Sequence, residues 1–213
     1  MTPQPHNTLL YHITHVDNLP NIIKSGGLWC DKKRVGKGFD STNIAHADIK
    51  ERRLKIPVPL YSGTTLANYV PFYFCNRAPM LYSIHTGYVK GYSDGQDSVI
   101  YLVTTIARVL ESESRWCFTD GHAVMTFSEF YNQIADLSKI DWLVIDNWSW
   151  RDTLEDNDRK RRKQAEFLVE DFVSWDLFDK IGVISNGIKK RVENILQTQS
   201  YQPDVSIEPS WYY

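Results

Sequence analysis

The stretch Arg162-Lys163-Gln164-Ala165-Glu166-Phe167-Leu168-Val169 changes abruptly from charged to apolar residues. An apolar run that follows a basic segment is typical of a strand entering a core, so we expect a strand over residues 166–173. Glu166 is then a carboxylate at the first position of that strand, at the mouth of the core. By residue type alone, its ordinary interpretation is a surface carboxylate at a strand edge.

A second apolar run, Leu9-Leu10-Tyr11-His12-Ile13-Thr14, lies near the N-terminus and carries polar residues of its own. Residues two apart on a strand point to the same face, so His12 and Thr14 share one face. A satisfied polar pair in a core strand is one interpretation. The other is functional, because a histidine on one strand and a glutamate on another is a recurrent way to hold NAD and act on its glycosidic bond.

The rest of the chain predicts short strands and helices that are interspersed without regular alternation. Further strands are expected at residues 69–75, 98–105, 116–118, 181–185 and from 205 onward. Helices are expected from an Asp17 N-cap to Gly26-Gly27, and at residues 44–54, 78–88, 104–112, 127–139 and 188–196. This pattern favours an α+β fold with mainly antiparallel strands, in a single domain over residues 1–213, instead of a doubly wound parallel sheet.

Three segments carry more specific expectations. Pro71 indicates that the strand at 69–75 is an edge strand or that it starts near Pro71. Residues 31–45 mix glycines with charges, which is typical of a mobile or ligand-shaped loop that closes over a bound molecule. The helix at 127–139 is expected to be amphipathic, with one apolar side formed by Phe127, Phe130, Tyr131, Ile134 and Leu137.

The composition is that of a soluble globular protein, with 42% hydrophobic and 23% charged residues. A net charge of −2 does not indicate a nucleic-acid binder, so any such role rests on a local patch. Seven Trp, twelve Tyr and nine Phe either fill the core or provide platforms on which bases stack. The three scattered cysteines, the lack of a long apolar run and the lack of a signal peptide together predict a cytoplasmic protein without membrane contact.

Several kinds of site are excluded by spacing. His12 and His15 are three apart on a strand and point to opposite faces, and no cluster has zinc spacing, so no metal site is expected. Neither a P-loop nor a G-x-G-x-x-G fingerprint is present. Cys75 and Cys117 lie in apolar aromatic strands, where thiols are usually inert, which leaves a Cys–His hydrolase as a distant alternative.

Five stretches, taken in order, resemble one known family. They are Tyr11-His12-Ile13-Thr14-His15-x-Asp17-Asn18-Leu19, Ile49-x-Glu51-Arg52-Arg53, Val70-Pro71-Phe72-Tyr73-Phe74-Cys75-x-Arg77-x-Pro79-Met80-Leu81-Tyr82, Phe118-Thr119-Asp120-x-His122 and Arg162–Val169. Together with the closing Trp211-Tyr212-Tyr213, they resemble DarT, a family of DNA ADP-ribosyltransferase toxins. Each match is weak by itself, but the ordered set covers nearly the whole chain.

The resemblance implies an ADP-ribosyltransferase-like fold, with two packed, mainly antiparallel sheets, peripheral helices and NAD in the cleft between the sheets. It implies transfer of ADP-ribose from NAD to a base in single-stranded DNA, chiefly thymine in a short sequence context, with release of nicotinamide and no metal. A related branch modifies guanine. The toxin is paired with a macrodomain antitoxin, DarG, which removes the modification.

The resemblance also implies roles for residues of the NAD site. Glu166 is the catalytic carboxylate, which grips the ribose 2′-hydroxyl as charge develops on the sugar and takes a proton from the base. Arg53 is the catalytic arginine, which stabilises charge near the pyrophosphate, whereas Arg52 points elsewhere. The resemblance implies that NAD is bound by four residues near the N-terminus: His12, which contacts the adenosine-side ribose, Thr14 beside it, Asn18 and Leu19.

A DNA-binding group follows from the same resemblance, with residues 149–165 as the target-recognition loop before the catalytic strand. Stacking and phosphate attraction are expected from Tyr73, Arg77, Met80, His122, Trp148, Trp150, Arg159 and Arg162. The ordinary interpretations are core packing for Tyr73 and Met80 and a solvated helix face for the basic run. Two alternatives stay open: an enzyme of the same fold that acts on guanine or on protein, and a non-catalytic single-stranded nucleic-acid-binding domain.

Overall fold

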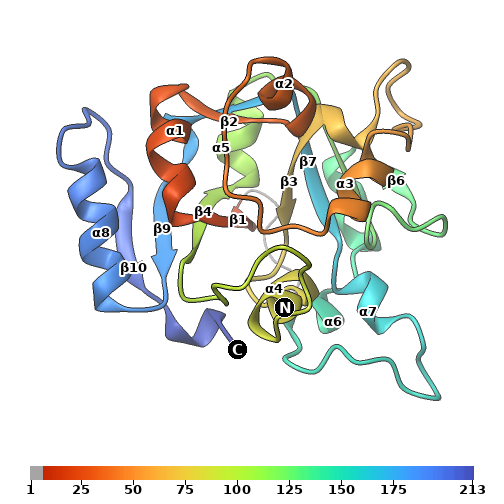
Figure 1. The fold of residues 1–213 in the computed structure, drawn as a ribbon. Coiled ribbons are helices and arrows are strands. Elements are labelled where there is room, and N and C mark those ends of the chain that lie inside the picture. Colours follow the sequence, from red (N-terminus) through yellow and green to blue (C-terminus); the bar gives the residue numbers. More distant parts are fainter. Residues whose placement is uncertain (1–6) are drawn as a thin grey trace.

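The structure is a computed structural model that describes residues 7–213 (Figure 1). The expectation that the first residues form no signal peptide concerns residues 1–6, which lie outside the described part. Within residues 7–213, ten strands form two sheets: β1 (Leu9–His15), β2 (Gly27–Trp29), β3 (Tyr69–Tyr73), β4 (Val99–Thr105), β5 (Trp116–Thr119), β6 (Phe130–Tyr131), β7 (Glu166–Glu170), β8 (Phe172–Ser174), β9 (Lys180–Val183) and β10 (Asp204–Ile207).

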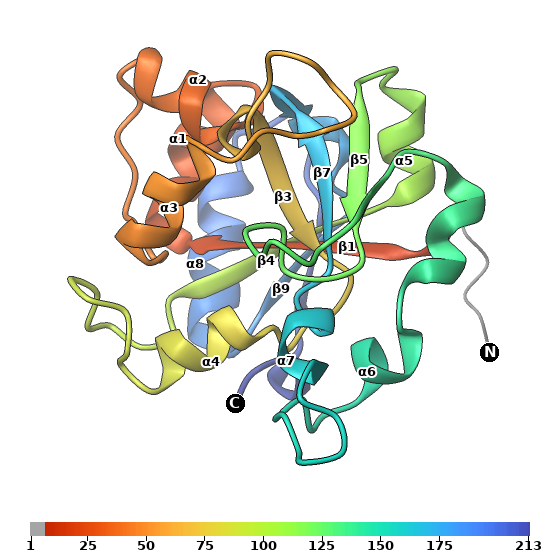
Figure 2. The same cartoon turned by 90° about the vertical axis from the view of Figure 1, so that its right-hand side faces the viewer.

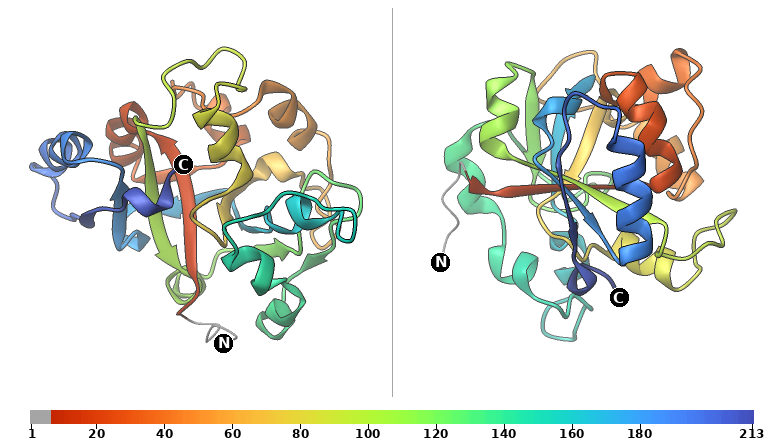
Figure 3. Two further views of the ribbon diagram at one scale, coloured as in Figure 1. Left: turned by 90° about the horizontal axis from the view of Figure 1, so that it is seen from below. Right: turned by 90° about the vertical axis from the view of Figure 1, so that its left-hand side faces the viewer.

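Short helices cover these sheets, as an α+β fold requires. They are α1 (Leu19–Lys24), α2 (Asp31–Gly36), α3 (Ala47–Arg53), α4 (Pro79–His85), α5 (Ile106–Glu111), α6 (Trp142–Asp146), α7 (Arg159–Arg162) and α8 (Asn186–Leu196). The longest, α8, packs against β9, β10 and α1, as the right-hand view of Figure 3 shows. No helix of the described residues is long and apolar enough to cross a membrane.

The large sheet has the order β10-β9-β4-β1-β3-β7-β5-β6, and β2 pairs with β8 in a small second sheet. The large sheet has two halves, β10-β9-β4-β1 and β3-β7-β5-β6. They meet at one narrow junction, where β1 and β3 share only the pair Tyr11–Tyr73. By contrast, β1 pairs with β4 over its whole length, and β3 does so with β7. In Figure 2, β1 lies across the view while β3, β7 and β5 stand steeply. The mainly antiparallel sheet therefore splays open between β1 and β3.

Both faces of the large sheet are buried, which explains its continuous apolar strands. On β4, Ile100 and Leu102 belong to one core cluster, whereas Val99, Tyr101 and Val103 belong to another on the opposite face. The strand at 98–105 was expected to be buried, and every residue from Val99 to Thr104 is buried. This rigid double-sided sheet is the scaffold on which the cleft residues are fixed.

The expectation that Pro71 marks an edge strand or a strand start was wrong, because β3 begins at Tyr69 and lies between β1 and β7. The N–H and C=O of one extended residue point to the same side of a strand. The Pro71 carbonyl faces β1, where it accepts a hydrogen bond from Nδ1 of His12 at 2.8 Å. The missing N–H of the proline therefore also faces the splayed junction, where no ladder bond is lost.

The expected helix at 127–139 was also wrong. Residues Phe130–Tyr131 form β6 against β5, and Ile134–Lys139 form a 3-10 helix. The cause is tertiary, because the ring of Tyr131 stacks on Phe118 of β5 with centroids 5.4 Å apart. Phe127, expected on an apolar core face, is instead 81% exposed.

Three smaller differences concern element ends. The loop expected at 31–45 begins with helix α2, and only the part after Gly36 is irregular. The N-cap of α1 is Asn18 and not Asp17. The strand expected over 166–173 divides into β7 and β8 at Asp171, whose φ of 59° interrupts the extended backbone.

Candidate active site

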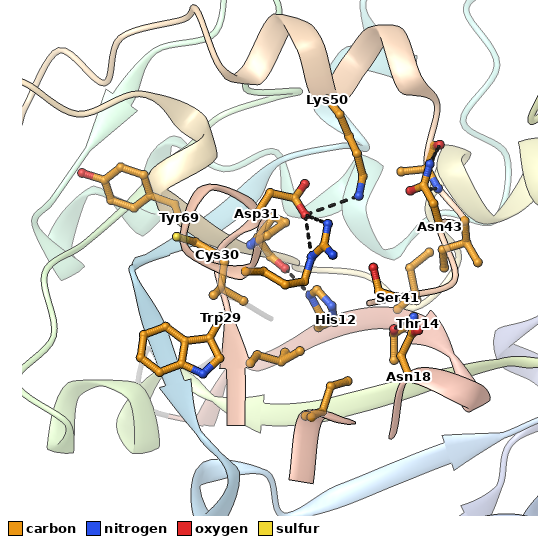
Figure 4. Close-up of a pocket in the computed structure, with 18 of the residues that line it drawn as sticks. His12, Thr14, Asn18, Trp29, Cys30, Asp31, Ser41, Asn43, Lys50 and Tyr69 are labelled. Carbon is orange, nitrogen blue, oxygen red and sulfur yellow. Dashed lines mark hydrogen bonds and ion pairs between the residues drawn. The ribbon is translucent and has the colours of Figure 1, made fainter. Parts of the chain in front are cut away.

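A deep cleft opens where the two halves of the sheet separate, bounded by β1, β3, β7, α2, α3 and the segment 39–45. Nearly all residues expected to bind NAD line it, including His12, Thr14, Asn18, Arg53 and Glu166. Figure 4 shows His12 and Thr14 projecting from β1 into this space, as their shared strand face predicts. Residues as far apart in the sequence as His12 and Glu166 therefore converge on one cavity.

Glu166 lines the cleft and is only 2% exposed, so it is not a surface carboxylate. Its Oε2 accepts a hydrogen bond from Nη1 of Arg53 at 2.8 Å, and its Oε1 accepts one from the backbone N–H of Ala123 at 3.0 Å. Each carboxylate oxygen thus has a fixed donor on a different element. A buried charge with such partners is oriented for one task.

His122 and Tyr73 stand beside Glu166 and line the cleft. Nε2 of His122 is 4.0 Å from Oε1 of Glu166. Burial lowers the pKa of His122, the Glu166 charge opposes that effect and the Arg53 charge adds to it, so the ring is neutral near pH 7. Burial, reinforced by Glu166, raises the pKa of the Tyr73 phenol far above its usual range. Both groups therefore act as neutral hydrogen-bonding groups.

His12 is held in one tautomer. Because Nδ1 donates its proton to the Pro71 carbonyl, Nε2 is left as an acceptor at the cleft. Burial lowers the pKa of His12, which keeps the ring neutral. A neutral Nε2 accepts a hydrogen bond from a hydroxyl group, which fits the expected partner, a ribose.

Asn18 connects β1 to the irregular segment 39–45. Its side-chain N–H group donates to Oγ1 of Thr14 at 3.0 Å and to the Thr42 carbonyl at 2.9 Å, and its oxygen accepts the Thr42 N–H at 2.7 Å. This amide fastens one wall of the cleft to its floor. Leu19, predicted beside it as an NAD contact, lies instead in the core with no exposed surface and does not line the cleft.

A charged cluster at the cleft wall was not anticipated from the sequence. Asp31 of α2 receives hydrogen bonds from Arg34 of its own helix and from Lys50 of α3 at 3.3 Å (Figure 4). The charges of Lys50 and Arg34 outweigh burial and lower the pKa of the Asp31 carboxyl. Residues 31–45 were assigned only a general loop role, and nothing in their spacing identifies Asp31 as the tie between two helices.

A second hollow adjoins the cleft and shares Ala45, Ile49, Tyr73, Met80 and His122 with it. Its other lining residues come from α3, α4, α7 and the loops before and after them, among them Arg52, Met125, Asp152, Lys160 and Gln164. Arg52 points away from Glu166, as expected, and donates to the Val124 carbonyl at 2.7 Å. Glu166 lines only the deep cleft, but His122, whose ring is 4.0 Å from it, lines both hollows, so the second hollow begins beside Glu166.

Comparison with known proteins decides the family. A family model described as "DarT: ssDNA thymidine ADP-ribosyltransferase, DarT" matches residues 11–213. The chain belongs to the DarT family. A DNA ADP-ribosyl transferase of Thermus aquaticus is 38% identical over 98% of this chain and 90% of its own length. A fusion of DNA ADP-ribosyl transferase with DNA ADP-ribosyl glycohydrolase from Thermosipho africanus is 26% identical over 87% of this chain and 46% of its own length.

Solved structures of DarT agree with the fold described above. Thermus sp. 2.9 DarT in complex with ADP-ribosylated ssDNA superposes with a TM-score of 0.92 at 37% identity, covering 100% of this chain and 99% of the other. Thermus sp. 2.9 DarT in complex with NAD+ gives a TM-score of 0.86 at 35% identity, with full coverage of both chains. The predicted ADP-ribosyltransferase-like fold is thus confirmed.

Not every residue of the predicted DNA-binding group reaches the cleft in this DarT-family chain. Tyr73, Met80 and His122 line both hollows, but Arg77 lies between the rings of Trp148 and Tyr213, 4.4 and 4.2 Å from their centroids. Nε1 of Trp150 donates to the Tyr213 hydroxyl at 2.7 Å. These residues form an aromatic cluster at the start of segment 149–165, whose role in target recognition stays a prediction.

Two arginines of the loop are engaged in internal contacts. Arg162 forms ion pairs with Asp141, Asp156 and Asp158, and Arg159 donates to the Ser149 carbonyl at 2.8 Å. Contact with DNA stays a prediction for both, but the structure gives Arg162 a role in fastening the loop. Among the described residues, no three His, Cys, Asp or Glu side chains gather as a metal site would need.

The thiols do not resemble nucleophiles. Burial raises the pKa of Cys75 to about 11 and that of Cys117 to about 12, so both stay protonated near neutral pH. The distant alternative of a Cys–His hydrolase therefore finds no support in the cleft.

Proposed function

We propose that this protein transfers ADP-ribose from NAD+ to thymine in single-stranded DNA, with Glu166 as the catalytic carboxylate. The observation that carries the proposal is the position of Glu166, which Arg53 and Ala123 hold in the deep cleft beside His122, a residue that lines both hollows. Membership of the DarT family and the likeness to DarT bound to NAD+ and to ADP-ribosylated ssDNA support it.

The deep cleft suits NAD+ as co-substrate. His12 offers the neutral acceptor Nε2 to a ribose hydroxyl, and the cations Arg34, Lys50 and Arg53 line the same cavity, where they favour a pyrophosphate. Asn18 and Thr42 hold the wall on the other side. We therefore assign NAD+ to this cleft, with the reacting ribose toward Glu166.

The reaction breaks the bond between ribose C1′ and nicotinamide, and the electron pair leaves with nicotinamide. Positive charge develops on the sugar, and Glu166 stabilises it by a hydrogen bond to the ribose 2′-hydroxyl that strengthens in the transition state. Thymine N3 forms the new bond to C1′, and its proton passes to Glu166 as general base. Arg53 orients the carboxylate throughout, which preorganises the site.

The second hollow suits an unstacked base. Tyr73 and Met80 form its boundary with the deep cleft and provide apolar contact, and Lys160 and Arg52 add positive charge for phosphates. A base that enters here lies next to His122 and Glu166, where NAD+ and DNA meet. Single-stranded DNA is the favoured substrate because its bases are already free to leave the stack.

We also propose that the modification is reversed by a macrodomain partner of the DarG type and that the enzyme acts as a toxin. The Thermosipho fusion supports this pairing, because one chain there joins a DNA ADP-ribosyl transferase to a DNA ADP-ribosyl glycohydrolase. The expected result of expression is growth arrest that a DarG-type macrodomain relieves. Undiminished growth with active enzyme in the cells would contradict the toxin role.

The test of the main proposal is incubation with NAD+ and four oligonucleotides, each with one kind of base replaced. Mass spectrometry should find an ADP-ribose adduct on every oligonucleotide except the one without thymine. An adduct that disappears only without guanine would move the protein to the guanine alternative. An adduct on added protein but on no DNA would overturn the proposal.

A further inference from the structure

The segment 119–123 encloses Glu166 from one side. Oγ1 of Thr119 accepts the backbone N–H of Glu166 at 3.2 Å and donates to the Gly121 carbonyl at 2.6 Å. The backbone N–H of Ala123 reaches back to Oε1 of Glu166. This segment therefore fixes both the main chain and the side chain of the catalytic residue, and its own position decides where the carboxylate points.

Arg161 of α7 holds this segment. Its Nη1 donates to Oδ1 of Asp120 at 3.0 Å and to Oγ of Ser128 at 3.2 Å, and its carbonyl accepts the His122 N–H at 2.9 Å. The rest of the guanidinium forms a bidentate pair with Asp158 at 2.7 Å for both bonds. The side chain and the backbone carbonyl of Arg161 thus both hold the segment against the loop expected to recognise the target.

Gly121 permits this clamp. A Cβ at residue 121 would overlap Nη1 of Arg161 and lie 2.9 Å from its Cγ, closer than real contacts allow. The guanidinium therefore packs directly on the glycine backbone. The Arg161 side chain is only 12% exposed. It therefore cannot move into solvent to make room for a Cβ without breaking its hydrogen bonds.

We propose that Arg161 is a positioning residue for the transfer reaction, which acts through Ala123 and His122 to hold Glu166 in its productive orientation. The inference rests on the proposed function. If the Ala123 N–H moves away, the Glu166 carboxylate keeps its charge but loses one of the two donors that fix its orientation. A small misplacement of a catalytic group lowers the reaction rate strongly. Gly121 is part of the same device because it makes room for the arginine.

The competing role for Arg161 is direct contact with a DNA phosphate, since it also lines the second hollow. The two roles differ in what substitution changes. A phosphate contact affects the KM for the oligonucleotide and the salt dependence of binding. Loss of a positioning residue lowers kcat with both KM values unchanged, and it also lowers any hydrolysis of NAD+ that proceeds without DNA.

The test compares Arg161→Met and Gly121→Ala with the control Arg115→Lys. Arg115 pairs with Glu170 and so joins the same strands, β5 and β7, at their far end. Both test variants should lower the kcat for transfer and for NAD+ hydrolysis by about ten- to a hundredfold, as expected for the loss of one hydrogen bond to a charged group. The control should keep wild-type rates, and wild-type transfer measured alongside tests the proposed function separately.

Two further measurements make the result decisive. The double variant should be no slower than the slower single variant, because both changes disrupt one contact. Hydrogen exchange of the Ala123 amide should become faster in the Arg161→Met variant than in the wild-type protein. The increase should exceed that of amides far from this segment, so that a lower melting temperature of the variant does not account for it. An unchanged kcat, a change in the oligonucleotide KM alone, or unchanged Ala123 exchange would each overturn the proposal.

Discussion

Replacement of Glu166 by glutamine is the sharpest perturbation of the site, because it changes charge with almost no change in shape. Each oxygen of Glu166 has its own donor, Arg53 Nη1 at 2.8 Å or Ala123 N–H at 3.0 Å. A glutamine has one acceptor oxygen and one N–H group. Whichever way the amide turns, one of the two donors faces another donor and is left unpaired.

The energetic cost follows from that count. An unpaired buried donor costs about 1–3 kcal/mol, and the Arg53 side chain is 11% exposed, so little water reaches it. For a chain of this length, a loss of about 2 kcal/mol lowers Tm by about 4–8 °C. The catalytic loss is larger, because removal of a general base costs about 10²–10⁴-fold and the grip on the ribose hydroxyl weakens as well. We expect transfer to fall at least a thousandfold.

The assay separates stability from chemistry by means of a second variant. Arg53→Met combined with Glu166→Gln removes the unpaired charge, so its Tm should recover at least half of the loss, while transfer stays abolished. Thermal unfolding and initial rates of oligonucleotide modification measure the two quantities. More than a tenth of wild-type transfer in Glu166→Gln, or a double variant less stable than the single one, would refute this account of Glu166.

Three further predictions concern the surroundings of the site. Asn18→Ala removes three hydrogen bonds that fix the cleft wall, so the KM for NAD+ should rise about tenfold with little change in kcat; an unchanged KM contradicts the role of Asn18. The folded-state pKa of His12 lies below its unfolded value, so its contribution to stability is present above about pH 6.5 and is lost as pH falls. The fall in Tm between pH 7 and 5 should therefore be smaller in His12→Gln, and an identical fall would contradict the assignment. Lys163→Met leaves the buried carbonyl of Ile145 and the partly buried carbonyl of Asn147 unpaired, so it should lower stability by about 1–3 kcal/mol, measured by urea unfolding. Wild-type stability would show that Lys163 does not anchor the segment that contains these two residues.

The elements that the sequence predicts best are those whose cause is local. Glu166 was placed at the start of a strand by the switch from basic to apolar residues, and β7 begins there. The common strand face of His12 and Thr14 follows from the period of two, and both line the cleft. Local pattern and side-chain type were sufficient in these cases, and the ordered family resemblance supplied the chemistry.

The features that the sequence did not predict depend on distant contacts. The chain at 127–139 has helical spacing, but stacking of Tyr131 on Phe118 turns part of it into a strand. Pro71 is tolerated inside the sheet only because β1 diverges from β3 at that point. The group of Ala123 that donates to Glu166 is its backbone N–H. Nearly every residue type has this group, so the sequence does not reveal that residue 123 holds the carboxylate. The tie between Asp31 and Lys50 likewise appears only once two helices are placed side by side.

The measurement that tests the central claim most directly uses a single-stranded oligonucleotide with one thymine, NAD+ and the purified protein. Intact mass spectrometry with fragmentation should locate one ADP-ribose group on that thymine with wild-type protein and none with Glu166→Gln. The same adduct from both proteins would contradict the role assigned to Glu166. No adduct from the wild-type protein, on this strand or on one with thymine in varied sequence contexts, would contradict the proposed function itself.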